Sequence, residues 1–178
     1  MRATQLTVSR NITYLHIRAI NPSSAQGFLE INGGRFACIL GQEGRTHFKR
    51  EGDGKSPIGR WKLGQLFYRP DKSSHMRGAK PLKATDGWCD AKGHRLYNRP
   101  VKRPFAASHE AMWRQDEAYD LVCLTDHNQR PRVQGLGSAI FLHVWRDGAV
   151  GTEGCIALKQ ADLRKVLRLC RSKAYLVI

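Results

Sequence analysis

The sequence predicts a mainly β fold, of the β-rich α+β class, with a single helix near the carboxyl end. Apolar runs of strand length recur along the chain, and the segment Asn32-Gly33-Gly34 between two of them is typical of a tight hairpin turn. Helical spacing of apolar residues is clear only at Leu163, Val166, Leu167 and Cys170. We expect strands at residues 5–8, 13–17, 28–31, 35–40, 60–66, 121–124, 139–144 and 174–178.

Length and composition fit one domain spanning residues 1–178. A chain of 178 residues with 41% apolar content can bury a core without disulfides or metals. We expect no membrane span, because no apolar run approaches the ~18 residues that a spanning helix needs. The first residues lack the apolar core of a secretory signal, and the five cysteines are scattered, so we expect a cytoplasmic protein. Export without a cleaved signal is the alternative.

The chain is strongly basic, with 30 Lys and Arg against 15 Asp and Glu, a formal net charge of +15. Such a charge attracts anionic ligands but does not determine a fold. A nucleic-acid binder is a distant alternative, because the basic residues are dispersed and no nucleic-acid motif is present. The sequence makes no prediction of the oligomeric state.

Residues 138–158 contain the sequence pattern that indicates a catalytic site. His143 ends an apolar run of strand length, and Cys155 follows twelve residues later, directly after Gly154. A cysteine attacks as its thiolate, and a nearby imidazole can accept the proton and return it to a leaving group. Gly154 permits close approach of the backbone, so that the N–H groups of residues 154 and 155 can stabilise an oxyanion. We predict Cys155, His143 and Gly154 as the catalytic residues.

The alternative for any single cysteine is burial in the core, and we expect this for Cys38, Cys89, Cys123 and Cys170. A zinc site is disfavoured because closely spaced ligand pairs are missing from the sequence. We therefore predict no metal and no cofactor.

Two motifs in this order resemble the L,D-transpeptidase catalytic domain of the YkuD type. The first is His143 followed by Thr152, Glu153, Gly154, Cys155 and Ile156, and the second is KREGDGKSPIGRWK at residues 49–62. Glu153 replaces the histidine that is usual before Gly-Cys, and Ala157 stands where many members have arginine. The resemblance covers nearly the whole chain and implies a β-sandwich with a C-terminal helix and a long loop over the site.

The resemblance also implies a substrate and a reaction. Cys155 would attack the carbonyl of the L-diamino acid in a peptidoglycan tetrapeptide and expel D-alanine. Peptidoglycan-derived peptides, which are anionic, would be the partners. We favour water as the acceptor, which makes an L,D-carboxypeptidase of peptidoglycan recycling. The alternatives are a transpeptidase that forms 3→3 cross-links or exchanges D-amino acids, an exported toxin that acts on the wall, and an inactive protein of the same fold.

Residues 68–112 are irregular in pattern, and their aromatic content argues against disorder, so we expect a lid or pocket wall. The segment 126–128 is interpreted as a polar turn or as support for the Cys-His pair. Candidate substrate-binding residues are Tyr97, Asn98 and His109 in the long segment, Thr152 in the motif, and Arg132 and Arg146 as carboxylate anchors. For each of them a structural or solvated role is the alternative.

Overall fold

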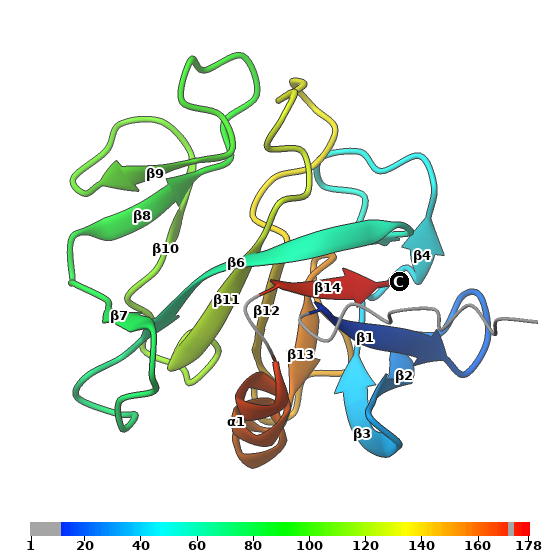
Figure 1. Ribbon diagram of the computed structural model, residues 1–178. Coiled ribbons are helices and arrows are strands. Elements are labelled where there is room, and N and C mark those ends of the chain that lie inside the picture. The colour runs from blue at the N-terminus through cyan, green and yellow to red at the C-terminus, as the bar shows by residue number, and fades with distance from the viewer. Residues whose placement is uncertain (1–11, 171–172) are drawn as a thin grey trace, which may run out of the picture.

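The computed structural model describes residues 12–170 and 173–178, and strands dominate its regular structure (Figure 1). The expected strand at 5–8 lies outside the described residues. The first half of the chain forms β1 (Ile12–Ala19), β2 (Gln26–Ile31), β3 (Gly34–Ile39), β4 (Arg45–Thr46), β5 (Ser56–Pro57), β6 (Arg60–Tyr68), β7 (Ala79–Pro81) and β8 (Asp86–Cys89). The second half forms β9 (Arg99–Lys102), β10 (His109–Ala111), β11 (Leu121–Thr125), β12 (Phe141–Val144), β13 (Ile156–Leu158), α1 (Gln160–Leu169) and β14 (Lys173–Val177).

Most of these strands belong to one nine-stranded sheet in the order β11-β12-β13-β3-β2-β1-β14-β6-β7. An additional pairing of β11 with β6 closes this sheet on itself. Two smaller sheets accompany it, β10-β8-β9 and β4-β5. The mainly β fold class with one helix near the carboxyl end is therefore confirmed for the described part of the chain.

The expected strands at 13–17, 28–31, 35–40, 60–66, 121–124, 139–144 and 174–178 all fall on observed strands, with small shifts at their ends. The hairpin between β2 and β3 follows the expected turn, with φ of 48° at Asn32 and 78° at Gly33. The apolar run that begins at Ala139 enters the sheet only at Phe141. Ala139 has φ of 51°, which is incompatible with extended strand geometry.

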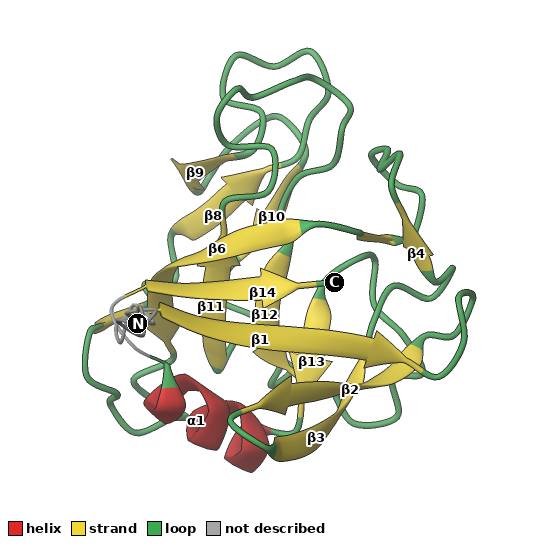
Figure 2. Cartoon of the chain, turned by 45° about the vertical axis from the view of Figure 1, so that its right-hand side comes forward, coloured by secondary structure: helices red, strands yellow, loops and turns green. Residues whose placement is uncertain are grey.

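Helix α1 lies against the sheet at the end where β12 and β13 finish (Figures 1 and 2). Its buried side chains are Leu163 and Val166, which are among the residues whose spacing predicts the helix. At ten residues, α1 is shorter than a membrane span, and no helix within the described residues is long and apolar enough to cross a bilayer.

The segment 68–112 is more ordered than its pattern predicts. We expected an irregular stretch, and instead it contains β7 to β10, of which β8, β9 and β10 form the three-stranded sheet seen at one side of Figure 1. Each of these strands has four residues or fewer, which is too short to produce a recognisable alternation of apolar residues.

Strands β11, β12 and β13 are buried on both faces, and this positions the site. Leu142 and Val144 of β12 face the main core, together with Ile156 and Leu158 of β13. Because successive side chains alternate between faces, Phe141 points to the other side. There it packs in a second apolar cluster with Trp88, Tyr119, Val122 and Cys155.

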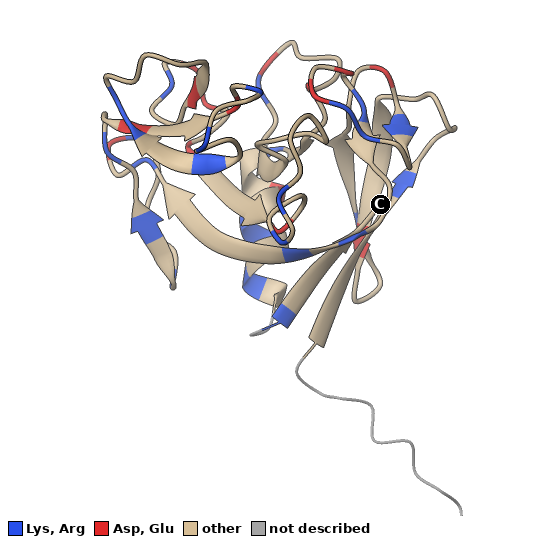
Figure 3. Cartoon of the chain, turned by 90° about the horizontal axis from the view of Figure 1, so that it is seen from above, with Lys and Arg blue, Asp and Glu red and all other residues tan. Residues whose placement is uncertain are grey.

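Lys and Arg side chains are spread over strands, loops and the helix (Figure 3). Carboxylates partner some of them, as in the pair between Lys165 and Asp162 on α1. The net charge of +15 is thus distributed over many elements.

Candidate active site

His143 and Cys155 both line one cavity of about 410 Å³ on the side of β12 and β13 that faces away from the main core. Charged and polar groups line much of this cavity. Its lining residues are Ile39, Gln42, Glu51, Gly52, Asp90, Glu110, Arg114, Ala118, Tyr119, Ser138, Ala139, His143, Arg146, Ala149, Gly151, Thr152, Glu153 and Cys155.

The register of two parallel strands brings the pair together. Leu142 pairs with Ile156 and His143 with Ala157, so Cys155, one residue before β13, lies beside Phe141. His143 and Cys155 therefore extend from the same face of neighbouring strands. Strand spacing and rise place their Cα atoms roughly 8 Å apart. Side chains at that separation can meet over a bound substrate.

The Cys155 sulfur is held by the backbone of the segment before and within β12. The thiol donates a hydrogen bond to the carbonyl oxygen of Ala139 at 3.1 Å and accepts one from the N–H of Phe141 at 3.3 Å. The residue is only 8% exposed, and burial raises the pKa of its thiol to about 12. The Phe141 N–H favours the thiolate but does not offset the burial. The resting group is therefore a neutral thiol.

His143 is neutral for the same reason. Burial lowers the pKa of its imidazole to about 4. Its Nδ1 lies 2.8 Å from the carbonyl oxygen of Val144, which can only accept, so Nδ1 carries the proton and Nε2 is left as a base. Tyr119 packs edge-on against the ring at 5.5 Å between centroids and fixes its orientation.

Cys155 and His143 therefore form a neutral thiol and a neutral base at physiological pH, and not an ion pair. The thiol proton points to the Ala139 carbonyl, so transfer to His143 requires the sulfur to turn when a substrate enters. Hydrogen bonds within catalytic pairs often align only when a substrate is bound.

Lys49, in the second motif, is a cation whose charge acts on this thiol. It is 6% exposed, forms an ion pair with Asp53, and favours the thiolate form of Cys155. A side-chain carbon placed on Gly154 would lie 3.1 Å from its Nζ, which locates the ammonium group directly beside the Gly-Cys turn. Glu110 and Glu153 act in the opposite direction and disfavour the thiolate.

Gly154 occupies a position that only glycine fits. Its φ is 127°, and a side-chain carbon would come within 2.7 Å of the Lys55 carbonyl oxygen. Its own carbonyl accepts a hydrogen bond from the Ser56 hydroxyl at 2.9 Å, which ties the two sequence motifs together. Its N–H, expected to face an oxyanion, instead donates to Thr152 Oγ1 at 3.1 Å. This donor is therefore used within the turn itself.

A charged network borders the cavity near His143. Arg114 donates two hydrogen bonds of 2.7 Å to Asp116, which hold the pKa of that carboxyl below its usual range. Arg146 lies 3.7 Å from the same carboxylate, and its side chain is 55% exposed. Burial raises the pKa of Glu110, whose carboxylate accepts a hydrogen bond from the Tyr119 hydroxyl at 3.2 Å. Of these two arginines, Arg146 thus has the side chain that is more accessible to a ligand.

The candidate substrate-binding residues divide between this cavity and its surroundings. Arg146 and Thr152 line the cavity, and Thr152 also donates a 2.7 Å hydrogen bond to the Cys155 carbonyl. Tyr97 and Asn98 lie outside the set of described residues that line it, and both are almost fully buried. The Tyr97 hydroxyl donates to Glu51, which does line the cavity, so Tyr97 reaches the site through a neighbour.

Asn98 holds several segments together and offers no free amide to a peptide. Its carbonyl oxygen accepts hydrogen bonds from the Trp88 ring N–H and the Ala139 N–H, and its NH₂ group donates to the carbonyls of His127 and Asn128. These bonds support the segment that carries Ala139, whose carbonyl accepts the Cys155 thiol.

His109 and Arg132 are also absent from the described residues that line the cavity. His109 begins β10, where its Nδ1 bonds the Ala107 carbonyl oxygen at 2.8 Å. One buried nitrogen of Arg132 makes no hydrogen bond within the described structure. Neither residue is brought to the Cys-His pair.

The segment 126–128 forms a turn behind the site. Asn128 has φ of 50° and bonds the backbone of Val133 and Gly137. Nε2 of His127 lies 3.0 Å from the Leu136 carbonyl oxygen, which can only accept, so Nε2 carries the proton and donates it. Burial lowers the pKa of this imidazole to about 4.

Sequence reasoning missed Lys49, Arg114 and Tyr119. Lys49 stands at the start of the second motif, and that motif was the available signal. The spacing Arg114-x-Asp116 suits a local ion pair but does not indicate a site. Tyr119 carries no signal in the sequence, because its contact with His143 depends on how the β10–β11 connection packs.

Comparison with known proteins identifies the family. The family model described as "L,D-transpeptidase catalytic domain" (YkuD) matches residues 20–178, so this chain belongs to the YkuD family of L,D-transpeptidase catalytic domains. No curated protein matches the chain. Among solved structures, the chain is similar to the helical cell shape determining protein Pgp2 from Campylobacter jejuni, with 18% identity and a TM-score of 0.42. That similarity covers 93% of this chain and 46% of the other, so the chain spans less than half of that protein.

The neutral resting pair predicts a specific pH dependence of thiol reactivity. Iodoacetamide alkylation of Cys155, followed by peptide mass mapping, should accelerate about tenfold per pH unit from pH 7 to 10 without a plateau, because the thiolate fraction rises in that proportion well below the thiol pKa. A plateau near neutral pH would show a thiolate–imidazolium pair and contradict the neutral site.

Substitution of Gly154 should damage the turn itself. Gly154→Ala forces an L-residue into a strained conformation against the Lys55 carbonyl, and we expect a loss of about 1–3 kcal/mol in the free energy of unfolding together with lost activity. Gly148→Ala is the matched control on the same β12–β13 connection, since its φ is 73° and its side-chain position is open. It should cost about 1 kcal/mol and leave activity intact. Equal effects of the two variants in chemical denaturation and activity assays would refute the role of the Gly154 turn.

Proposed function

We propose that this protein hydrolyses the bond between the L-diamino acid and the terminal D-alanine of peptidoglycan tetrapeptides, through a thioester on Cys155. The observation that carries the proposal is the placement of Cys155 and His143 on one face of neighbouring strands, in a polar cavity bordered by arginines. The family to which the chain belongs acts on peptidoglycan, which supplies the substrate class.

The chemistry follows from the protonation states of the pair. The Cys155 sulfur leaves the Ala139 carbonyl, gives its proton to Nε2 of His143 and attacks the substrate carbonyl. When the C–N bond breaks, His143 returns the proton to the departing amine of D-alanine. Water then attacks the thioester, His143 accepts a proton from it, and the thiol is restored as the C–S bond breaks.

Two features assist this sequence. The ammonium group of Lys49, beside the Gly-Cys turn, favours negative charge on the sulfur as its proton leaves. The backbone N–H of Cys155 is our proposed oxyanion donor, because the N–H of Gly154 is used by Thr152. Water is our preferred acceptor because hydrolysis requires no second peptide site.

The proposal is tested by incubating the purified chain with a disaccharide tetrapeptide and following D-alanine release by mass spectrometry. We expect release by the native protein and none by Cys155→Ala. The control is Cys170→Ala, which removes a partly buried sulfur at the end of α1 and should retain activity. Equal release by native protein and Cys155→Ala contradicts the proposal. If an added D-amino acid is incorporated into the product instead, the acceptor is an amine and not water.

Arg146 is our proposed anchor for a substrate carboxylate. Arg146→Ala should raise KM about tenfold with little change in kcat, because one charge-assisted hydrogen bond contributes about 1.5–3 kcal/mol. Arg132→Ala is the control, since Arg132 is not among the described residues that line the cavity. An equal change in KM for both variants, measured by steady-state kinetics, would remove Arg146 from the site.

A further inference from the structure

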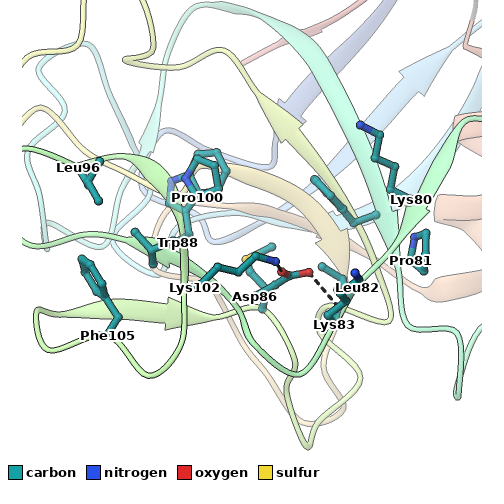
Figure 4. Close-up of a pocket in the computed structure, with 14 residues that line it drawn as sticks. Lys80, Pro81, Leu82, Lys83, Asp86, Trp88, Leu96, Pro100, Lys102 and Phe105 are labelled. Atoms are coloured by element: carbon teal, nitrogen blue, oxygen red, sulfur yellow. Dashed lines mark hydrogen bonds and ion pairs between the residues drawn. The ribbon is translucent and has the colours of Figure 1, made fainter.

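A second cavity, of about 630 Å³, lies between the three-stranded sheet and the β6–β7 edge of the large sheet (Figure 4). It shares no lining residue with the catalytic cavity. Its lining residues are Phe67, Lys80, Pro81, Leu82, Lys83, Asp86, Gly87, Trp88, Leu96, Pro100, Val101, Lys102, Phe105 and Met112. Volume and lining are those of a small-molecule site, which is mostly apolar with a few placed polar groups.

The two ends of this groove differ in chemistry. Leu96, Trp88, Pro100 and Phe105 gather toward one side in Figure 4, whereas Lys80, Pro81, Leu82 and Lys83 lie toward the other. The groove is thus apolar at one end and cationic at the other.

The cationic end is left with an excess of positive charge. Asp86 forms an ion pair with Lys102, and its other oxygen accepts a hydrogen bond from the backbone N–H of Lys83. Among the described residues, the ammonium groups of Lys80 and Lys83 have no such carboxylate partner, and both side chains are exposed. A bound anion would therefore find two uncompensated charges beside the apolar channel.

The lining disfavours a peptide. An extended backbone needs partners for its N–H and C=O groups, and the polar side chains of the lining are confined to the charged residues and Trp88. The Trp88 ring N–H already donates to Asn98 at 2.9 Å. Strand β9 is an edge strand but contains Pro100, which cannot donate to an added strand. A hydrocarbon chain makes no such demands.

We propose that this groove binds a single-chain amphiphile, with its hydrocarbon chain along Leu96, Trp88 and Phe105 and its anionic group between Lys80 and Lys83. The site is separate from the Cys155 reaction and does not depend on it. Trp88, which lines the groove, nevertheless belongs to the apolar cluster that contains Cys155. In that cluster it packs edge-on against Phe141, with 5.4 Å between the ring centroids.

The test is calorimetric titration of the full Cys155→Ala chain with dodecyl phosphate below its micelle concentration. Cys155→Ala keeps the measurement independent of any turnover. We expect one bound molecule per chain, at least tenfold weaker binding of dodecyltrimethylammonium, and no measurable binding of inorganic phosphate. Binding to many sites, equal binding of both amphiphiles, or preference for an acidic Leu-Glu peptide overturns the proposal.

Variants locate the site. The double substitution Lys80→Glu and Lys83→Glu should weaken dodecyl phosphate binding at least tenfold, because it reverses the charge that attracts the anion. Both positions are exposed. Arg168→Glu with Lys173→Glu, an equal change of charge at exposed positions on α1 and β14, should leave binding unaltered. Leu96→Asp should weaken binding from the apolar end, with circular dichroism to confirm folding. Equal loss in the charge variant and its control would show attraction by net charge alone and refute the groove.

Discussion

The parallel pairing of β12 with β13 is the constraint on which the site depends. Its register sets Leu142 beside Ile156 and His143 beside Ala157, and the alternation of side chains then assigns each residue to a face. A slip of one residue would turn His143 into the main core and Leu142 toward the cavity, which burial on both faces makes costly. The leucines and isoleucine that fill the core thereby also fix the imidazole and the thiol.

Burial on both faces has an electrostatic consequence. The surroundings that hold the pair in place also raise the pKa of Cys155 and lower that of His143, so each group rests in its uncharged form. In the proposed reaction, the charges that develop on these buried groups would be stabilised by fixed groups of the protein. Lys49 is the cation that the fold provides beside the turn, and its pair with Asp53 keeps it there. The two carboxylates Glu110 and Glu153 oppose it and disfavour the thiolate.

Much of the fold could be predicted from local pattern, because most of the strands are long enough to show alternation or a continuous apolar run. The strands β7 to β10 could not, since pairing between very short segments leaves no periodicity to detect. That His143 and Cys155 line one cavity could be predicted, because a strand end and a Gly-Cys turn mark them in the sequence. Asn98 was taken for a substrate ligand, because a polar residue in an irregular segment gives no sign of the four hydrogen bonds that bury it. Lys49 stands in the second motif and Arg114 has a local ion-pair partner in Asp116, but neither pattern shows that these residues lie near Cys155 and His143.

Two residues of this chain that depart from the usual motif, Ala157 and Glu153, have defined positions in the structure. Ala157 is fully buried between His143 and Ile39, so its side chain does not reach the cavity, whereas the exposed Arg146 lines it. Glu153, which directly precedes Gly154 and Cys155, lines the cavity.

The most direct test of this account is the titration of His143 by ¹⁵N NMR in the folded protein. We predict a neutral ring with its proton on Nδ1 throughout the physiological range, charging only as the pH falls toward about 4. A ring that is already charged at pH 7, and that loses this charge in Cys155→Ala, would contradict the account.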